Sequence, residues 1–185
     1  MYGLVNKAVE QLVVSQFGEE RWREIADKAN VKQPFISMNA YPDHVTFDLV
    51  EAASEVLDTP PEVILEAFGE HWIQYTVDEG YGKLIALYGD SVVEFLQNMD
   101  SLHAQIRLSF PELKPPVISC EPQADGQLMV SYQSERTGLA PMLVGLVKGL
   151  GKRFSTPVCV KYVESDKNNT GTELFLVSFE QQQAA

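Results

Sequence analysis

The sequence is poor in cysteine and has no long apolar run, and each shortage excludes a class of protein. The two cysteines, Cys120 and Cys159, form no C-x-x-C pair, so we expect two reduced thiols buried in strands. No apolar stretch approaches the ~20 residues that a membrane-spanning helix needs. The N-terminus also lacks the basic leader and unbroken apolar segment of a signal peptide. These absences predict a soluble, cytoplasmic protein that acts at no membrane.

Positive charge is also scarce. The chain has 14 Lys+Arg against 26 Asp+Glu, giving a formal net charge of −12. Binding to nucleic acid or to an anionic membrane requires a basic surface, so this balance argues against both kinds of partner. The 185 residues are 45% hydrophobic, which is enough for one core, and we predict a single domain over residues 1–185.

Hydrophobic periodicity predicts a helical part over about residues 1–110. Two sequence signals predict helix starts within it. Thr59 with Glu62, and Ser91 with Glu94, have the spacing of capping boxes, in which a hydroxyl and a carboxylate bind free backbone N–H groups. The expected helices cover approximately residues 5–18, 22–29, 43–57, 60–75, 81–88 and 91–109.

The pattern changes after Pro111. Two strands joined through Asp125-Gly126, one helix rich in small residues and two further strands predict a ββαββ unit over about residues 111–181. The last residues, 182–185, are expected to be a frayed tail. The predicted fold class is therefore α+β, with an N-terminal helical part packed on a four-stranded antiparallel sheet.

One predicted strand has an unusual end. Leu128, Val130, Tyr132, Ser134 and Arg136 share one face, because side chains two apart in a strand point the same way. The face is first apolar and then carries two hydroxyls and a guanidinium. Either the stripe leaves the core, with Arg136 in water or paired with a local acid, or these groups bind an anionic ligand. The spacing leaves both interpretations open.

His103 is the second unusual residue. Among the three histidines, only His103 is expected on an otherwise apolar helix face, formed by Leu96, Met99, Ile106 and Phe110. It could be a core histidine that binds a carbonyl. No Cys/His cluster offers a zinc site, but a single neutral imidazole in an apolar cleft is also typical of an axial ligand to haem iron.

Taken together, these segments resemble the H-NOX family, the haem-nitric oxide/oxygen binding domains related to the sensor domain of soluble guanylate cyclase. The family signature Y-x-S-x-R is present as "YQSER", residues 132–136, and the ligand segment as "NMDSLHAQIRLSFPELKPP", residues 98–116. "MYGLVN", "AFGEHW" and "GLVKGLGKRF" are also similar to family segments. The resemblance covers essentially the whole chain and is closest to the stand-alone bacterial type.

The resemblance implies that a non-covalent haem b, with its iron, lies between the helical part and the sheet. It implies that His103 is the iron ligand and that Tyr132, Ser134 and Arg136 bind the haem propionates. Pro116 would contact and distort the macrocycle. The wall on the side where gas binds would be formed by Val5, Trp72, Met142 and Leu146.

The resemblance also implies a gas-sensing role without catalysis. Family members that hold oxygen use a tyrosine where this chain has Met142, so we expect NO and CO to bind and O2 to be excluded. NO would break the iron–histidine bond and signal to a histidine kinase or a cyclic-nucleotide signalling enzyme. The alternatives are an O2 sensor that uses Tyr75 or Trp72 as the donor, or a module of the same architecture that binds another small molecule. A peroxidase is disfavoured, because the expected wall offers no acid or base.

Overall fold

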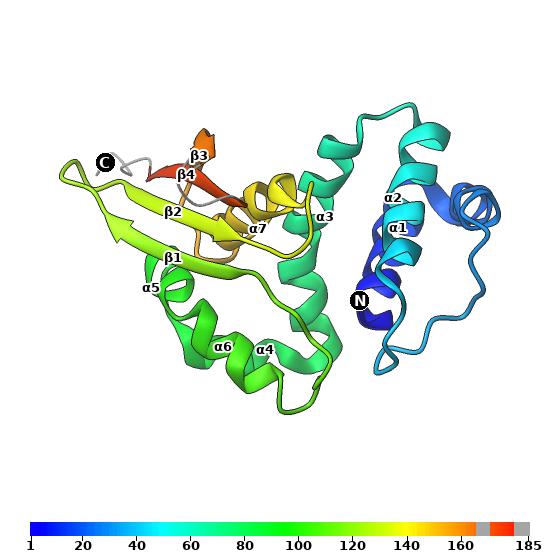
Figure 1. The fold of residues 1–185 in the computed structure, drawn as a ribbon, viewed down its shortest axis with the longest axis horizontal. Helices are drawn as coiled ribbons and strands as arrows, with labels where there is room; N and C mark the ends of the chain where they lie inside the picture. Colours follow the sequence, from blue (N-terminus) through cyan, green and yellow to red (C-terminus); the bar gives the residue numbers. More distant parts are fainter. Residues whose placement is uncertain (166–170, 180–185) are drawn as a thin grey trace.

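The chain forms a group of helices followed by a four-stranded antiparallel sheet (Figure 1). The computed structural model describes residues 1–165 and 171–179, so most of the loop predicted at 166–171 and the tail at 182–185 lie outside the described residues. Within the described ranges, none of the helices combines the length and the apolarity that crossing a bilayer requires. The helices before the sheet are α1 (Gly3–Lys28), α2 (Asp43–Leu57), α3 (Pro61–Thr76), the π-helix η1 (Val77–Tyr81), α4 (Gly82–Ile85), the 3-10 helix η2 (Ala86–Tyr88), α5 (Val92–Gln97) and α6 (Met99–Ile106).

The sheet confirms the predicted ββαββ order and the α+β class. Its elements are β1 (Val117–Pro122), β2 (Leu128–Gln133), α7 (Ala140–Arg153), β3 (Val158–Ser165) and β4 (Thr172–Phe179). The strand order is β1-β2-β4-β3, and each neighbouring pair is antiparallel. The expected alternation of β2 is also present, because Leu128, Val130 and Tyr132 are buried whereas Gln133 is exposed.

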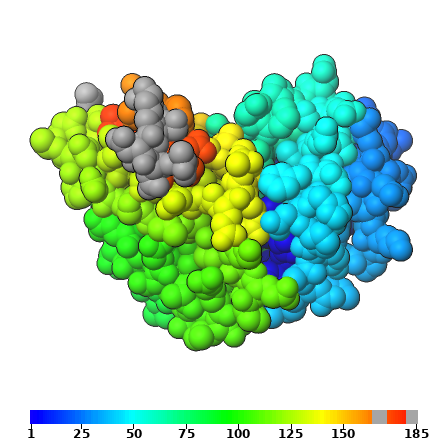
Figure 2. Space-filling view, in the orientation of Figure 1, coloured from blue at the N-terminus to red at the C-terminus, as the bar shows by residue number. Residues whose placement is uncertain are grey.

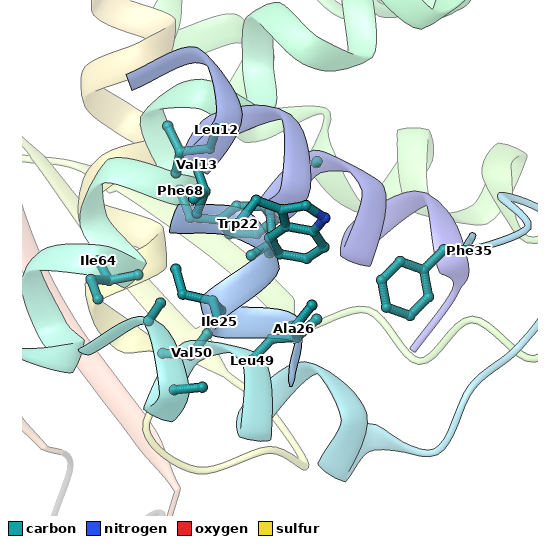
Figure 3. Close-up of a cluster of buried hydrophobic side chains, with 14 of the residues drawn as sticks. Leu12, Val13, Trp22, Ile25, Ala26, Phe35, Leu49, Val50, Ile64 and Phe68 are labelled. Carbon is teal, nitrogen blue, oxygen red and sulfur yellow. The ribbon is translucent and has the colours of Figure 1, made fainter. Parts of the chain in front are cut away.

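Two hydrophobic clusters form the interior, and α3 contributes to both. The first lies among α1, α2 and α3, where Trp22, Ile25 and Leu49 pack together (Figure 3). The second joins the inward face of the sheet to α5, α6 and α7. On the surface shown in Figure 2, the N-terminal helices in blue and cyan meet the green and yellow C-terminal part along one boundary. The helix α3 supplies Phe68 to the first cluster and Ile73 to the second, so it connects the two parts.

The helices α3 and α7 cross at very short range. A Cβ built on Gly145 would lie 1.8 Å from the Glu66 carbonyl oxygen, and one on Gly69 would lie 2.1 Å from the Met142 carbonyl oxygen. Only a residue without a side chain permits this approach of two backbones. Lys148 Nζ, one turn along α7, donates to Glu66 at 2.5 Å. The crossing fixes the position of α7 against α3 and therefore the spacing of the side chains that project beside it.

The two predicted capping boxes differ in outcome. Ser91 caps α5, since the Glu94 N–H donates to its Oγ at 3.2 Å, although the Glu94 carboxylate accepts from Asp90 N instead of Ser91 N. The prediction of a capping box at Thr59 is wrong, because the Thr59 side chain does not cap α3. The helix α3 begins at Pro61, and the Thr59 hydroxyl donates to the Leu57 carbonyl at 3.0 Å, because the double proline moves the helix start by one residue.

The predicted continuous helix over 91–109 is also wrong. It is interrupted at Asn98, whose φ of −96° and ψ of 4° separate α5 from α6. The Asn98 side-chain amide donates to the Tyr88 carbonyl at 3.1 Å, which stabilises this non-helical position. Consequently His103 lies on a short helix of its own, and Phe110 is buried beyond the end of that helix. By contrast, the two helices expected before residue 30 follow one another end to end in α1, with the interruption at Gly18.

The cysteines lie on strands, as predicted, but only Cys120 is partly buried. Cys120 on β1 is half-buried, and burial raises the pKa of its thiol to about 11. Cys159 on β3 is exposed, which contradicts the expectation that both thiols are buried. The reason is its register: Cys159 pairs with Ser178 on the sheet face opposite to the one that packs on α7, since its neighbours Val158 and Val160 pack into the second cluster.

Candidate functional site

A cavity lies between the two hydrophobic clusters, and its wall is built from elements distant in sequence. Residues from α1, α2, α3, α6, β2 and α7 contribute to it, together with the segment 112–116 that joins α6 to β1. The structure brings together in this wall every residue that the sequence singled out as a binding residue: His103, Tyr132, Ser134, Arg136, Pro116, Met142, Trp72, Val5 and Leu146. A ligand in this cavity would contact both the helical part and the sheet.

His103 reaches the cavity from α6. Its Nδ1 atom is buried and makes no hydrogen bond within the described part of the chain. Burial lowers the pKa of the imidazole below its usual value, while the nearby Asp100 carboxylate and Pro116 carbonyl act in the opposite direction. The Pro116 carbonyl is therefore close to the ring but not in hydrogen-bonding geometry with Nδ1. A neutral imidazole with an unpaired buried nitrogen is suited to accept a metal ion or a hydrogen-bond partner.

Metal binding at this position would depend on one side chain. Among the described residues, no group of three or more His, Cys, Asp or Glu side chains is arranged to hold a metal ion. Zinc and similar ions need three or four protein ligands, whereas an iron ion held in a macrocycle needs one or two. Any metal at His103 would therefore have to bring most of its own ligands.

Arg136 lies at the polar end of the cavity wall and is largely buried, with 15% of its side chain exposed. Its Nε donates to Asp43 Oδ2 at 2.7 Å and its Nη2 to Asp43 Oδ1 at 3.2 Å, while Nη1 donates to the Lys114 carbonyl at 2.6 Å. The interpretation of Arg136 as a residue in water is thus wrong, and its acidic partner is 93 residues away rather than local. Because a guanidinium has five N–H groups, two remain for another acceptor.

Asp43 connects this arginine to the start of the chain. The Met1 amine donates to Asp43 Oδ1 at 2.7 Å, so one carboxylate binds two cations. The Arg136 hydrogen bond is the main cause that lowers the pKa of Asp43 to about 2. Asp43, the first residue of α2, was not identified as a site residue from the sequence. A carboxylate at a helix start is common, and no local signal connects it to Arg136.

The two hydroxyl residues of the motif differ in their surroundings. Tyr132 is buried, and burial raises the pKa of its phenol. Ser134 follows the end of β2, and its Oγ accepts from the Arg136 N–H at 3.1 Å. This bond fixes the turn that directs Arg136 to the cavity. The three side chains together form a donor-rich end, which favours a carboxylate or another anion.

The remaining wall is apolar on the side of α1, α3 and α7. It contains Val5, Trp72, Met142 and Leu146, none of which carries a charge or a hydroxyl. Tyr75 is not part of this wall: it is buried at 2% exposure and its hydroxyl has no partner in the described structure. The wall also includes Tyr81, which the sequence analysis missed because a π-helix, not a regular helix, carries it there.

Comparison with known proteins connects this cavity to one family. The family model described as haem-NO-binding matches residues 2–162. The chain is 32% identical over 169 residues to soluble guanylate cyclase gcy-35 of Caenorhabditis elegans, covering 89% of this chain and 25% of that protein. It is 33% identical over 93 residues to the guanylate cyclase soluble subunit beta-2 of Rattus norvegicus, covering 50% of this chain and 14% of the relative. The chain thus spans about a quarter or less of these relatives.

Solved structures show the same fold. An H-NOX protein from S. oneidensis in the Fe(II)NO ligation state superposes with a TM-score of 0.87 at 19% identity, covering 98% of this chain and 100% of that chain. An oxygen-binding H-NOX domain related to soluble guanylate cyclases, in its oxygen complex, gives a TM-score of 0.81 at 19% identity, covering 98% and 96%. One architecture therefore occurs in neighbours that hold either gas.

Proposed function

Because the chain belongs to the haem-NO-binding family and has the H-NOX fold, we propose that its cavity binds haem b and that the protein senses NO and CO. The single observation that supports this most is the composition of one cavity. An unpaired, neutral His103 and the donor-rich end around Arg136 lie in the same apolar wall. These are the groups that a macrocycle with one axial ligand and two carboxylates requires.

Each residue of the wall has a role in this proposal. His103 is the iron ligand, and Tyr132, Ser134 and Arg136 donate to the two carboxylates. Pro116 lies in the wall next to His103 and contacts the ring system. When bound, the haem supplies a ferrous iron on which a diatomic gas can bind. Val5, Met142 and Leu146 exclude water from that iron, because their side chains offer no hydrogen-bond donor to hold it.

The gas preference follows from Met142. Dioxygen bound to ferrous iron gains negative charge, so a distal donor stabilises it more than it stabilises CO. A hydrogen bond to such a partly charged group contributes roughly 1.5–3 kcal/mol, or about a ten- to hundredfold change in affinity. A thioether is only a weak acceptor and donates nothing. We therefore expect stable complexes with NO and CO and no persistent oxygen complex.

Signalling would start at α6. His103 would hold the haem iron, and loss of that bond would leave the imidazole and the short helix that carries it free to move. The helix is continuous with the 107–116 segment, which holds Pro116 and the Lys114 carbonyl that accepts from Arg136. Movement of α6 would therefore reach α2, which begins at Asp43, through Arg136. The receiving protein we propose is a histidine kinase or a cyclic-nucleotide signalling enzyme.

An absorption spectrum of the purified protein tests the proposal directly. We expect a Soret band, and we expect His103→Gly to lose most of its haem unless imidazole is added to replace the missing ligand. His44→Gly is the matched control, because His44 is exposed and outside the cavity wall. Full haem content in His103→Gly without imidazole would exclude His103 as the ligand, and wild-type protein that takes up no haem would refute the proposal.

Oxygen sensing is the second candidate, and one observation favours it. Trp72 lies in the apolar wall and carries an indole N–H, so it could act as the donor that Met142 cannot be. Tyr75 is less suited, since it lies outside the wall. A persistent oxygen complex in air that disappears in Trp72→Phe would favour this candidate over NO selectivity.

A further inference from the structure

A groove on the outer surface runs alongside the cavity, and the segment of Lys114, Pro115 and Pro116 separates the two. The residues in the wall of both hollows are His103, Lys114, Pro115, Pro116 and Ser134, whereas Arg107 and Glu135 are in the wall of the groove only. Lys114 Nζ donates to Glu135 Oε2 at 3.1 Å, and both side chains are well exposed, at 63% and 73%. Lys114 is therefore a cation at the edge of the cavity with a solvent-exposed partner.

The charges at this polar end do not balance if the cavity holds a ligand with two carboxylates. Arg136 and the Met1 amine contribute two positive charges, and Asp43, which binds both of them, removes one. Glu112, which also lines the cavity, adds a negative charge, so a net charge of at most +1 would face a ligand charge of −2. Partly buried charge that is left unpaired is unfavourable, so a further cation is needed near the second carboxylate.

We propose that Lys114 is this second carboxylate-binding cation and that it exchanges Glu135 for a propionate of the bound haem. The inference rests on the proposed haem function. Two observations place Lys114 beside the proposed carboxylate site. Its backbone carbonyl accepts a hydrogen bond from Arg136, and its side chain lines the same cavity as Ser134. Exchange is easy because exposed ion pairs contribute little, about 0–1 kcal/mol, and a long lysine side chain has many rotamers.

Other cations near this end are less suited to the role. Arg107 lines the groove but not the cavity, and its Nε donates to the Leu113 carbonyl at 3.2 Å. Lys148 and Lys152 are on α7 and pair with Glu66 and Glu70 on α3. Lys114 is accordingly the one lysine or arginine in the described cavity wall besides Arg136.

The test is the rate at which ferric haem passes from the loaded protein to an excess of a haem-scavenging apoprotein at low salt. Lys114→Gln should release haem about two- to fivefold faster than wild type, and the difference should shrink at high salt. Glu135→Gln should release haem more slowly than wild type, because Lys114 loses its competing partner. Lys161→Gln, on the exposed strand β3, is the charge-matched control and should behave as wild type.

Loading the same proteins with haem dimethyl ester identifies the cause. The ester has no carboxylates, so Lys114→Gln and wild type should then release it at equal rates. Equal release of ordinary haem by the two proteins would overturn the inference, and so would an acceleration that persists with the ester, since that would indicate lost packing. Wild-type protein that binds no haem would instead refute the proposed function, so the two failures are distinguishable.

Discussion

Substituting Gly145 with alanine should separate α3 from α7 and destabilise the protein. The new Cβ would lie 1.8 Å from the Glu66 carbonyl oxygen, whereas ordinary contacts begin at 3.4 Å, so the helices must move apart by 3.4 − 1.8 = 1.6 Å. The obstacle is backbone, which no rotamer change can relieve. Overpacking of this kind costs about 1–3 kcal/mol, and the better helix propensity of alanine returns at most about 1 kcal/mol.

Because the obstacle is backbone, we expect the upper part of this range, about 2–3 kcal/mol, so a net loss of about 1–2 kcal/mol should be visible in thermal unfolding of the apo protein. For a chain of this size each kcal/mol corresponds to about 2–4 °C, so we expect the Tm to fall by about 2–8 °C. A second effect should accompany it, because Met142 and Leu146 flank Gly145 on α7 and line the cavity. A wider crossing would enlarge the apolar wall and accelerate CO dissociation from the loaded protein.

Gly82→Ala provides the matched control. Its Cβ would lie 3.2 Å from Val77 Cγ1, the end of a side chain that can rotate away, so stability should stay the same or rise by up to about 1 kcal/mol. If Gly145→Ala unfolds at the wild-type temperature, the close crossing does not hold α3 against α7. The crossing would then not determine the width of the cavity wall either.

Three further results should follow from the polar contacts. Arg136→Ala removes two hydrogen bonds to Asp43 and should lower the Tm by about 2–8 °C. The coordination spectrum of any retained haem should stay unchanged. An altered spectrum would contradict the role of Arg136 at a carboxylate. Because the pKa of Asp43 is lowered to about 2, its contribution is present above pH 4 and lost as the pH falls towards 2, so Asp43→Asn should flatten the acid side of a stability–pH curve. Since the Asp43 side chain is 42% exposed, this contribution should be only about 1 kcal/mol. Ser91→Ala removes the cap of α5 and should cost about 1 kcal/mol in denaturant unfolding, whereas Ser101→Ala on the exposed surface should not.

The fold was largely predictable because its signals are local. Alternation of apolar and polar residues in β2 and the small-residue helix α7 both appear at the predicted positions. The errors have tertiary causes. Asn98 interrupts a helix because its side chain binds the Tyr88 carbonyl, and no pattern in the segment 91–109 contains that information. Thr59 could not be the cap, because the second proline of the pair, not the first, starts α3.

The sequence singled out residues that line the candidate site, but it did not show which charged groups of the site pair with one another. The spacing of Tyr132, Ser134 and Arg136 left an anionic ligand as one of two interpretations, and the structure places these groups in a cavity wall with His103. The Asp43 carboxylate and the Met1 amine could not be inferred, since they reach Arg136 only through the packing of α2 beside the sheet end. The position of Lys114 in the cavity wall could not be predicted either, because a lysine before two prolines is typical of any exposed loop.

The break at Asn98 sets the energy scale on which His103 can move. The helix α6 is eight residues long and only Met99 and Leu102 of it are buried. Burial of such a side chain contributes about 1.5–3 kcal/mol, so the two anchors together resist displacement by about 3–6 kcal/mol. Consider a protein that populates one of two conformations at 99%. A ligand that raises the population of the other conformation to 99% must bind that conformation more favourably by about 5.5 kcal/mol. A continuous helix over 91–109 would have carried the buried Val92, Phe95 and Leu96 with it and raised the resistance well beyond that value. The interruption therefore leaves His103 on an element whose displacement costs about as much as a single selective ligand can supply.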